Sequence, residues 1–223
     1  MTSQDPPTAA RVLVLEGMHV RLRTMDACDA DGPFGHWLAD PKIVYPMNLP
    51  VRELPREKLV DYIEGFDRRT RFLFAIEDGT ELVGSAQAFC GFWMVQVDSA
   101  QHTATVYLAS DPGHRLGPVV ALETILLASD WMLEAGIVKV SAQAVSTNRR
   151  AINLFRTIGF PQEGMLRDEV FDLTRDEGRV DLVRYGILRR EYPAFRERLK
   201  QQIARVAARI KRRNGQRQEP RAA

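Results

Sequence analysis

Seven short stretches of the chain, either mostly apolar or alternating between apolar and polar residues, predict β-strands. Alternation is clear in residues 103–110, where Ala104, Val106 and Leu108 are separated by Thr or Tyr, as in a strand with one buried face. Asp78-Gly79 follows one stretch and predicts a tight hairpin turn into the next. The predicted strands are residues 18–23, 72–77, 81–92, 103–110, 138–145, 162–173 and 179–188.

Apolar residues spaced three or four apart predict helices between these strands. The longest helix is predicted to begin at Pro118 and to stop at Gly136, because proline suits a first helical turn and glycine a C-terminus. Asn148 is predicted to be the N-cap of a shorter helix that ends at Ile158. Two further helices are expected at residues 27–39 and 55–69, an ordered loop with three prolines at 40–50, and a disordered N-terminus at 1–11.

The predicted order β-α-α-β-β-β-α-β-α-β-β fits a mixed α/β sheet that is mostly antiparallel and flanked by helices. It lacks the strict alternation of a doubly wound fold. A length of 223 residues suits one domain with an appendage. No apolar run reaches the ~18 residues of a membrane helix. Cys28 and Cys90 are far apart and the four histidines are scattered, so we expect a cytoplasmic protein without disulfides or a metal site.

Charge is distributed unevenly along the chain. Residues 189–223 carry twelve Lys/Arg and three Asp/Glu, whereas the rest has a net charge of −7. We therefore divide the chain into residues 1–11, a domain at 12–188 and a basic helical tail at 189–223. The tail has apolar residues at helical spacing, namely Leu188, Tyr192, Phe195, Leu199, Ile203, Val206 and Ile210. We favour packing of this stripe on the body; the alternative is an arm, within residues 189–221, for RNA, the ribosome or an anionic surface.

The segment between Leu108 and Val120 is the best candidate site. A strand there leads through Asp111–Gly117 into the N-terminus of the long helix, where unpaired backbone N–H groups and the helix dipole favour an anion such as pyrophosphate. His114 and Arg115 would add positive charge. The spacing fits neither a P-loop nor G-x-G-x-x-G, and an ordinary strand-to-helix turn stays open as the alternative.

Five stretches in this order resemble the GNAT superfamily of acyl-CoA-dependent N-acetyltransferases, in particular its ribosomal-protein and polyamine branch. The most specific match is NRRAINLFRTIGF at 148–160, which resembles N-x-x-A-I-x-L-[YF]-x-x-x-G-F. The others are GMHVRLR at 17–23, the paired segments FLFAIE and LVGS within 72–85, the loop at 111–117, and the closing segments at 164–168 and 180–188. Together they cover about residues 16–192.

The resemblance implies that strands 103–110 and 138–145 splay apart and hold the pantetheine arm of acetyl-CoA, with the pyrophosphate on the following loop. The acceptor would be a primary amine, such as a protein N-terminus, a polyamine or another small amine, which attacks directly in a ternary complex. No metal is implied. The positions implied to contact the co-substrate are Leu108, Ser110, His114, Arg115, Leu116, Gly117, Val119, Asn148 and Phe155.

Three positions depart from the family pattern. Val119 narrows the phosphate loop, Thr105 stands where many relatives carry a glutamate base, and Phe155 replaces a tyrosine acid. Neither Thr105 nor Phe155 can transfer protons near neutral pH. Tyr107 is the candidate catalytic residue that remains, with His102 and Asp172 as further substitutes.

These departures keep other functions open. The alternatives are a non-catalytic acyl-CoA-binding protein and an RNA- or ribosome-associated protein built on this fold; a homodimer is open as well. Trp93 and Trp131 are expected to be core or edge aromatics rather than a substrate platform.

Overall fold

The computed structural model describes residues 13–79, 89–111, 113–114, 116–173 and 178–218. Within them eight strands form one sheet in the order β1-β2-β3-β4-β5-β6-β8-β7. All neighbours are antiparallel except β5 and β6, which are parallel. The strands are β1 (Val14–Glu16), β2 (Val20–Thr24), β3 (Arg71–Asp78), β4 (Phe89–Asp98), β5 (Thr103–Ser110), β6 (Lys139–Val145), β7 (Gln162–Phe171) and β8 (Arg179–Leu188). The mixed, mostly antiparallel sheet is thus confirmed.

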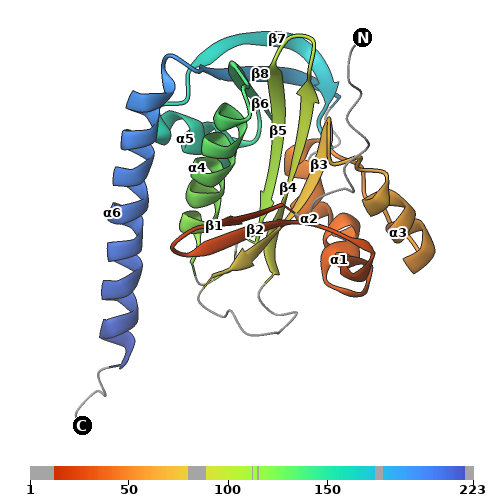
Figure 1. The fold of residues 1–223 in the computed structure, drawn as a ribbon, viewed down its shortest axis with the longest axis horizontal. Helices are drawn as coiled ribbons and strands as arrows, with labels where there is room; N and C mark the ends of the chain where they lie inside the picture. The colour runs from red at the N-terminus through yellow and green to blue at the C-terminus, as the bar shows by residue number, and fades with distance from the viewer. Residues whose placement is uncertain (1–12, 80–88, 112, 115, 174–177, 219–223) are drawn as a thin grey trace, which may run out of the picture.

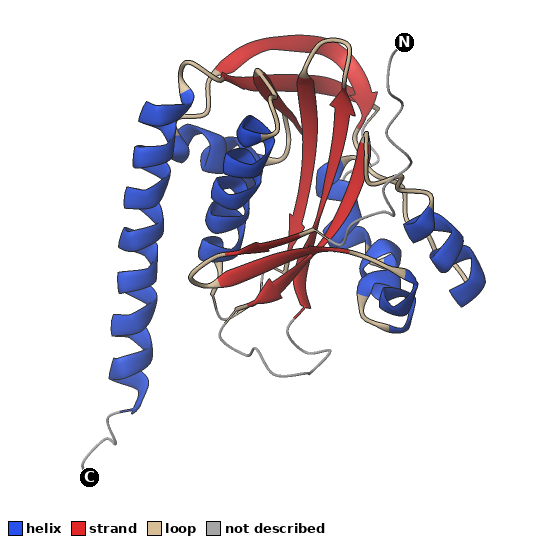
Figure 2. Cartoon of the chain, viewed as in Figure 1, coloured by secondary structure: helices blue, strands red, loops and turns tan. Residues whose placement is uncertain are grey.

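Helices cover both faces of this sheet (Figures 1 and 2). The short N-terminal helices lie on one face, and α4, α5 and α6 lie on the other. The described helices are η1 (Ala27–Asp31), α1 (Phe34–Ala39), α2 (Pro41–Val44), η2 (Tyr45–Met47), α3 (Arg56–Glu64), α4 (Pro118–Glu134), α5 (Arg149–Ile158) and α6 (Tyr192–Gln218).

Two hydrophobic clusters lie on opposite faces of the sheet and bury the central strand β3 on both sides. Phe72 and Phe74 face the α4 side, and Leu73 and Ala75 face the α1 side, because successive residues of a strand point to opposite faces. Trp131 of α4 contacts the rings of both phenylalanines, with centroids 5.0 and 5.5 Å apart. Trp131 is half-buried and Trp93 is buried, so both tryptophans pack in or against the core, although Trp93 also lines the cavity described below.

The termini of α4 and α5 follow the predicted signals. Pro118 begins α4, and Gly136 follows it with a φ of +94°. Asn148 caps α5, since its Oδ1 accepts a hydrogen bond from the Ala151 N–H at 3.0 Å. Gly159 ends that helix in the left-handed conformation, which glycine adopts without the Cβ penalty.

Several local predictions were wrong. The helix expected at 27–39 is divided into η1 and α1, and the helix expected at 55–69 ends at Glu64. Asp78 belongs to β3 and pairs with Val20, so Asp78-Gly79 is not a tight turn into the next strand. That strand, β4, continues to Asp98 instead of ending at residue 92, and residues 80–88 lie outside the described part. Residues 40–50 contain α2 and η2 rather than a loop, because the Asp40 side chain caps α2 at the Lys42 N–H, 2.8 Å away. Strand β1 was not anticipated.

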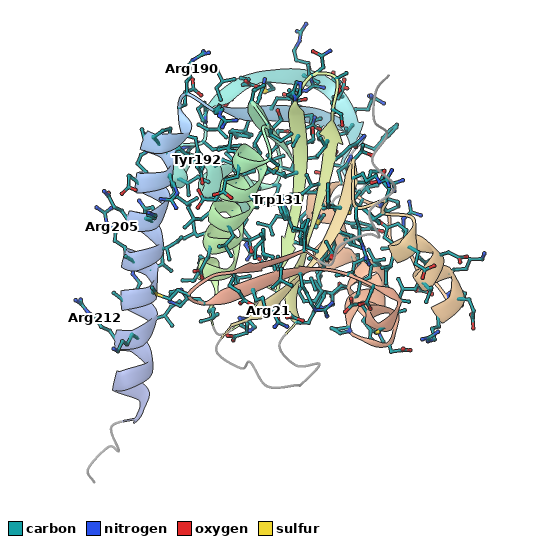
Figure 3. All side chains as sticks on the ribbon, viewed as in Figure 1. Arg21, Trp131, Arg190, Tyr192, Arg205 and Arg212 are labelled. Carbon is teal, nitrogen blue, oxygen red and sulfur yellow. The ribbon has the colours of Figure 1, made fainter. Side chains whose placement is uncertain are left out.

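The apolar stripe of α6 packs on the body, as favoured from the sequence. Tyr192, Phe195, Leu199 and Ile203 are buried in the cluster beneath α4. The Tyr192 hydroxyl donates to Asp130 Oδ1 at 2.7 Å, and burial together with that carboxylate raises the pKa of Tyr192. Figure 3 shows Tyr192 between the helices, while Arg205 and Arg212 project away from the body. No helix in the described part is both long and apolar enough to span a membrane.

Candidate functional site

Strands β5 and β6 separate halfway along their length. They pair from Thr103 with Lys139 to Val106 with Ala142, and no pairing follows although β5 runs on to Ser110 and β6 to Val145. The predicted splay is therefore confirmed. Backbone groups along the gap no longer bond across it and can pair with an extended ligand that lies there like an added strand.

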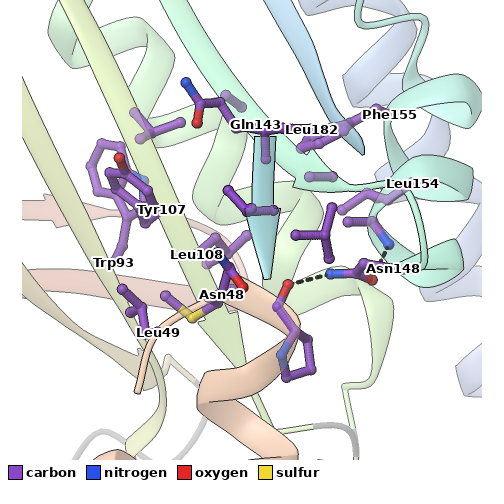
Figure 4. A pocket seen from close by; sticks show the side chains of 18 of the residues that line it. Asn48, Leu49, Trp93, Tyr107, Leu108, Gln143, Asn148, Leu154, Phe155 and Leu182 are labelled. Atoms are coloured by element: carbon purple, nitrogen blue, oxygen red, sulfur yellow. Dashed lines mark hydrogen bonds between the residues drawn. The ribbon is translucent and has the colours of Figure 1, made fainter. Parts of the chain in front are cut away.

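A cavity of about 300 Å³ occupies this gap (Figure 4). Tyr107 and Leu108 are consecutive on β5, yet both line it. Since successive strand residues point to opposite faces, the cavity passes through the sheet from the α4–α5 side to the side of η2. Two ligands can therefore approach its centre from opposite faces.

A second cavity of about 180 Å³ extends to Ser110 and shares six lining residues with the first, namely Pro46, Met47, Leu108, Asn148, Ala151 and Leu154. Lys42 of α2 and Arg150 of α5 are the charged side chains among its described lining residues. Both are exposed cations and can neutralise phosphate oxygens at this end.

The side chain of Asn148 joins two walls of the site. Its Oδ1 caps α5 at Ala151, and its Nδ2 donates to the Pro46 carbonyl of η2 at 2.7 Å. Figure 4 shows both hydrogen bonds. The N-cap thereby fixes η2 and the residues after it, Asn48 and Leu49, against the helix that faces the splayed strands.

The loop after β5 has less free hydrogen-bonding capacity than predicted. Gly117 has a φ of +48°, and its N–H donates to the His114 carbonyl at 2.8 Å. The tight turn also satisfies other N–H groups between residues 111 and 120, through these pairs: Gly113 to Asp111 Oδ1, His114 to Asp111 O, Leu116 to His114 Nδ1, Val119 to Leu116 O, and Val120 to Gly117 O. The expectation of several unpaired N–H groups was thus wrong for the described loop, and a phosphate must displace one of these acceptors to bind there.

Five of the predicted site residues come together around the two cavities. They are Tyr107, Leu108, Ser110, Asn148 and Phe155. The Phe155 ring packs on Tyr185, with centroids 4.5 Å apart.

The loop residues among the predicted set do not line the cavities. Leu116 and Val119 are buried in the core, so the Val119 side chain does not narrow the loop as expected. His114 Nε2 lies 3.5 Å from Asp78 Oδ2, and Arg115 lies outside the described residues.

The other candidates for proton transfer lie away from the cavity. His102 is exposed in the turn before β5, with a φ of +53°. Asp172 is buried just after β7 and does not line either cavity. Thr105 also lines neither and pairs with Ser141.

Sequence reasoning missed four polar residues that line the cavities, namely Lys42, Asn48, Gln143 and Arg150. In the sequence, the only signal for Asn48 was its place in a proline-rich segment. Lys42 and Arg150 are distant in sequence from the loop at 111–117, where the phosphate site was predicted. The described residues contain no group of three or more His, Cys, Asp or Glu suited to a metal ion.

The model of the acetyltransferase (GNAT) domain family matches residues 19–161. The chain belongs to the GNAT acetyltransferase family. It is therefore an acetyl-CoA-dependent acyltransferase, as the GNAT family uses acetyl-CoA as co-substrate. Among relatives, the uncharacterized N-acetyltransferase p20 of Bacillus licheniformis is 25% identical over 179 residues, which cover 77% of this chain and 93% of that protein.

Solved GNAT structures share the fold. Spermidine N-acetyltransferase from Vibrio cholerae, in complex with CoA and spermine, has a TM-score of 0.66 at 19% identity over 79% of this chain and 99% of that one. Ribosomal-protein-S5-alanine acetyltransferase from Vibrio fischeri has a TM-score of 0.63 at 16% identity over 79% and 97%. At these identities the likeness establishes the architecture of this GNAT protein and not its acceptor.

Proposed function

We propose that this GNAT protein transfers an acetyl group from acetyl-CoA to a primary amine by direct attack in a ternary complex. The observation that carries this proposal is the cavity that passes through the sheet where β5 and β6 part. Its described lining contains no Ser, Thr, Cys, Asp, Glu, His or Lys, which leaves Tyr107 as the one described side chain there of a type that forms covalent intermediates, and we assign its hydroxyl to proton transfer instead. A donor from one face and an amine from the other would meet at its centre.

On the donor side, the pantetheine arm would pair with the open edges of β5 and β6 near Leu108, beside Asn148 and Phe155. The phosphates would reach the second cavity, where Ser110, Lys42 and Arg150 line the wall. We keep Leu116, Gly117 and Val119 as loop positions whose N–H groups bind phosphate once their present acceptors are displaced. His114 and Arg115 would contribute charge.

The reaction needs one neutral amine and one protonated leaving group. The amine nitrogen forms a bond to the thioester carbonyl carbon and the carbon–sulfur bond breaks. The sulfur takes up a proton from an acid on the protein, and the nitrogen loses one to water, from which that acid is reprotonated. Tyr107 is the titratable residue among the described lining residues of the central cavity. We propose that its hydroxyl donates the proton to the sulfur, since Thr105 and Phe155 cannot.

The decisive test combines binding with turnover for the full-length protein. Calorimetry should detect acetyl-CoA binding, and thiol release should follow addition of suitable amines. Tyr107→Phe should lower kcat by about 10²-fold or more at unchanged acetyl-CoA affinity. Binding without thiol release for any amine would instead support the non-catalytic alternative, and an unchanged kcat would remove Tyr107 from the mechanism.

The compartment and a second partner complete this proposal. Cys28 and Cys90 are both free, which supports a reducing compartment, and we assign the protein to the cytoplasm. We further propose that the exposed basic side of α6 binds a polyanion such as RNA. The division at residue 188 would then separate two parts of the chain by charge and by partner. It would not separate two folding units, because the first half of α6 shares the core of the body.

A further inference from the structure

No charged side chain of the described residues lines the central cavity on the side that faces η2. Among the described lining residues of the cavity, the side chains with hydrogen-bonding groups are those of Asn48, Trp93, Tyr107, Gln143 and Asn148. Asn148 already uses its amide to bind Ala151 and Pro46. An amine that enters from this face therefore meets apolar surface and very few hydrogen-bonding groups.

Asn48 provides an unused hydrogen-bond acceptor at this place. Its Oδ1 is buried and has no hydrogen-bond partner among the described residues. A buried carbonyl oxygen without a partner carries a desolvation cost, which a ligand N–H would remove. Figure 4 shows Asn48 close to Leu108 in the pocket.

The backbone holds Asn48 in place. The residue has the left-handed conformation, φ 55° and ψ 39°, and its N–H donates to the Tyr45 carbonyl at 2.8 Å. The Pro46 carbonyl two residues earlier is bound by Asn148. Asparagine tolerates this conformation better than most residues, so the sequence suits a fixed acceptor here.

We propose that Asn48 Oδ1 accepts a hydrogen bond from the attacking amine, and that this subsite selects a primary amine of low pKa attached to an apolar group. An α-amino group beside an apolar side chain and an aromatic amine share this chemistry; a polycationic amine does not. The inference rests on the proposed acetyl transfer and specifies its acceptor.

The reason is the cost of bringing an ammonium group into a site without a carboxylate. Desolvation lowers the pKa of a buried amine, so the ammonium gives its proton to water before the nitrogen attacks. At pH 7 roughly a tenth of an α-amino group, with a pKa of about 7.7–8.0, is neutral, against fewer than about one in a thousand of a lysine-like amine at about 10.4.

The charged groups described on the surrounding elements supply no carboxylate to the site. Lys42 of α2 and Arg150 of α5 line the adjoining cavity, where the phosphates of acetyl-CoA would neutralise them. The acidic residues of β7 and β8 and the residue after β7, namely Glu163, Asp168, Glu169, Asp172 and Asp181, do not line either cavity. A site of this kind needs no side-chain base, which is consistent with Thr105 at the position of the family's glutamate.

Two substitutions at Asn48 test this without altering the backbone, because Gly and Asp both accept the left-handed conformation. Asn48→Gly removes the acceptor, and Asn48→Asp adds a carboxylate of the same shape. The matched control is Asn153→Asp on the exposed face of α5. The probes are an apolar dipeptide, an aromatic amine, and a linear diamine, each measured for kcat/KM and for binding to the CoA-saturated protein by calorimetry.

The wild type should prefer the dipeptide or the aromatic amine to the diamine. Which of these two it prefers decides whether the acceptor is an α-amino group or an aromatic amine. Asn48→Gly should lower kcat/KM for the preferred amine about tenfold, and Asn48→Asp should shift the ratio toward the diamine at least tenfold. CoA affinity should be unchanged in both. Preference of the wild type for the diamine, or unchanged ratios in both variants, would overturn this inference while leaving acetyl transfer intact. If the wild type does not bind CoA at all, the proposed function itself is contradicted.

Discussion

Asn148 has two separable roles at the scale of a single residue. Its oxygen caps α5, and its nitrogen holds the Pro46 carbonyl of η2. Only the first could be predicted from the sequence, because an N-cap is a local signal. The second joins residues 102 positions apart, and no periodicity or motif indicates such a contact.

Asn148→Ala and Asn148→Asp distinguish these roles. Asn148→Ala should lower the free energy of unfolding by about 1–2 kcal/mol, since it removes the cap and leaves Pro46 unpaired. Asn148→Asp keeps an acceptor for the Ala151 N–H and loses only the donor to Pro46, so it should retain most of the helix stability. Urea denaturation gives both values.

The same pair separates stability from the arrangement of the site. If η2 is held in place by Asn148, both variants should raise KM for the amine about fivefold or more. A rise confined to Asn148→Ala would mean that capping alone matters and that the contact with Pro46 has no part in binding the acceptor.

Phe155 illustrates what a motif can and cannot indicate about a residue. Its position on a helix facing the splayed strands followed from the NRRAINLFRTIGF match. Its contact with Tyr185 of β8, at a centroid distance of 4.5 Å, depends on a final strand and could not be read from that motif. The ring contributes packing at the site, and Tyr107 is the residue that we propose provides the hydroxyl.

At the scale of elements, local signals predicted α4 and α5 well and the segment before them poorly. Pro118, Asn148 and Gly159 act on their own helices, so sequence alone indicates their effect. Residues 40–50 form helices of only four and three residues, too short for an apolar periodicity. Their fold depends on a side-chain cap from Asp40 and on the contact with Asn148.

The loop after β5 was predicted as an anion site, and its internal hydrogen bonds change how that prediction should be tested. Gly117 combines a φ of +48° with a ψ of −126°, which other residues rarely adopt. Any substitution there would strain the backbone and confuse loss of binding with loss of structure. The cations at the second cavity offer a cleaner test.

Lys42→Gln and Arg150→Gln should each weaken acetyl-CoA binding about five-fold, because each removes roughly 1 kcal/mol of attraction to phosphate at a partly exposed site. S-acetylpantetheine lacks the nucleotide phosphates, and its affinity should be unchanged. The matched control is Arg156→Gln on α5, an exposed arginine that lines neither cavity. Equal losses for both ligands, measured by calorimetry, would mean that these cations do not contact the phosphates.

At the scale of the whole molecule, the chain separates an apolar reaction cavity from a strongly basic surface. The sequence indicated this surface through charge counts, but it could not decide which side of the tail helix would remain open. The structure buries the apolar stripe of α6 against the body, and Val206 and Ile210 also pack there. A helix that binds a bilayer needs a free apolar face, so the open side of α6 suits electrostatic contact with a polyanion rather than insertion into a membrane.

Arg205, Arg209 and Arg212 follow one another at spacings of four and three residues and are all exposed. They lie along one side of α6 over about 10 Å, a distance over which several phosphates of a nucleic acid strand can be contacted. Between residues 198 and 212 the helix contains no acidic residue, so nothing on this part of it offsets their charge. The triple Gln variant at these positions should weaken binding to single-stranded RNA at least five-fold and reduce the dependence of log K on log salt by about 2, given roughly 0.7 per phosphate contact.

The control carries the same change in charge on the body: Arg69, Arg167 and Arg184 replaced together by Gln, all exposed. If net charge alone governs binding, both triple variants will weaken it equally; if α6 is the contact surface, only its own variant will. Acetyl-CoA turnover should be the same in both, because none of the six arginines lines either cavity. Salt-independent RNA binding, or equal losses in the two variants, would contradict the assignment of this surface to α6.

Vesicles of anionic lipid provide the last comparison. Because the apolar stripe of α6 is already buried, such vesicles should bind the protein only weakly at physiological salt. Binding to vesicles that is stronger than binding to RNA would indicate a membrane surface as the partner.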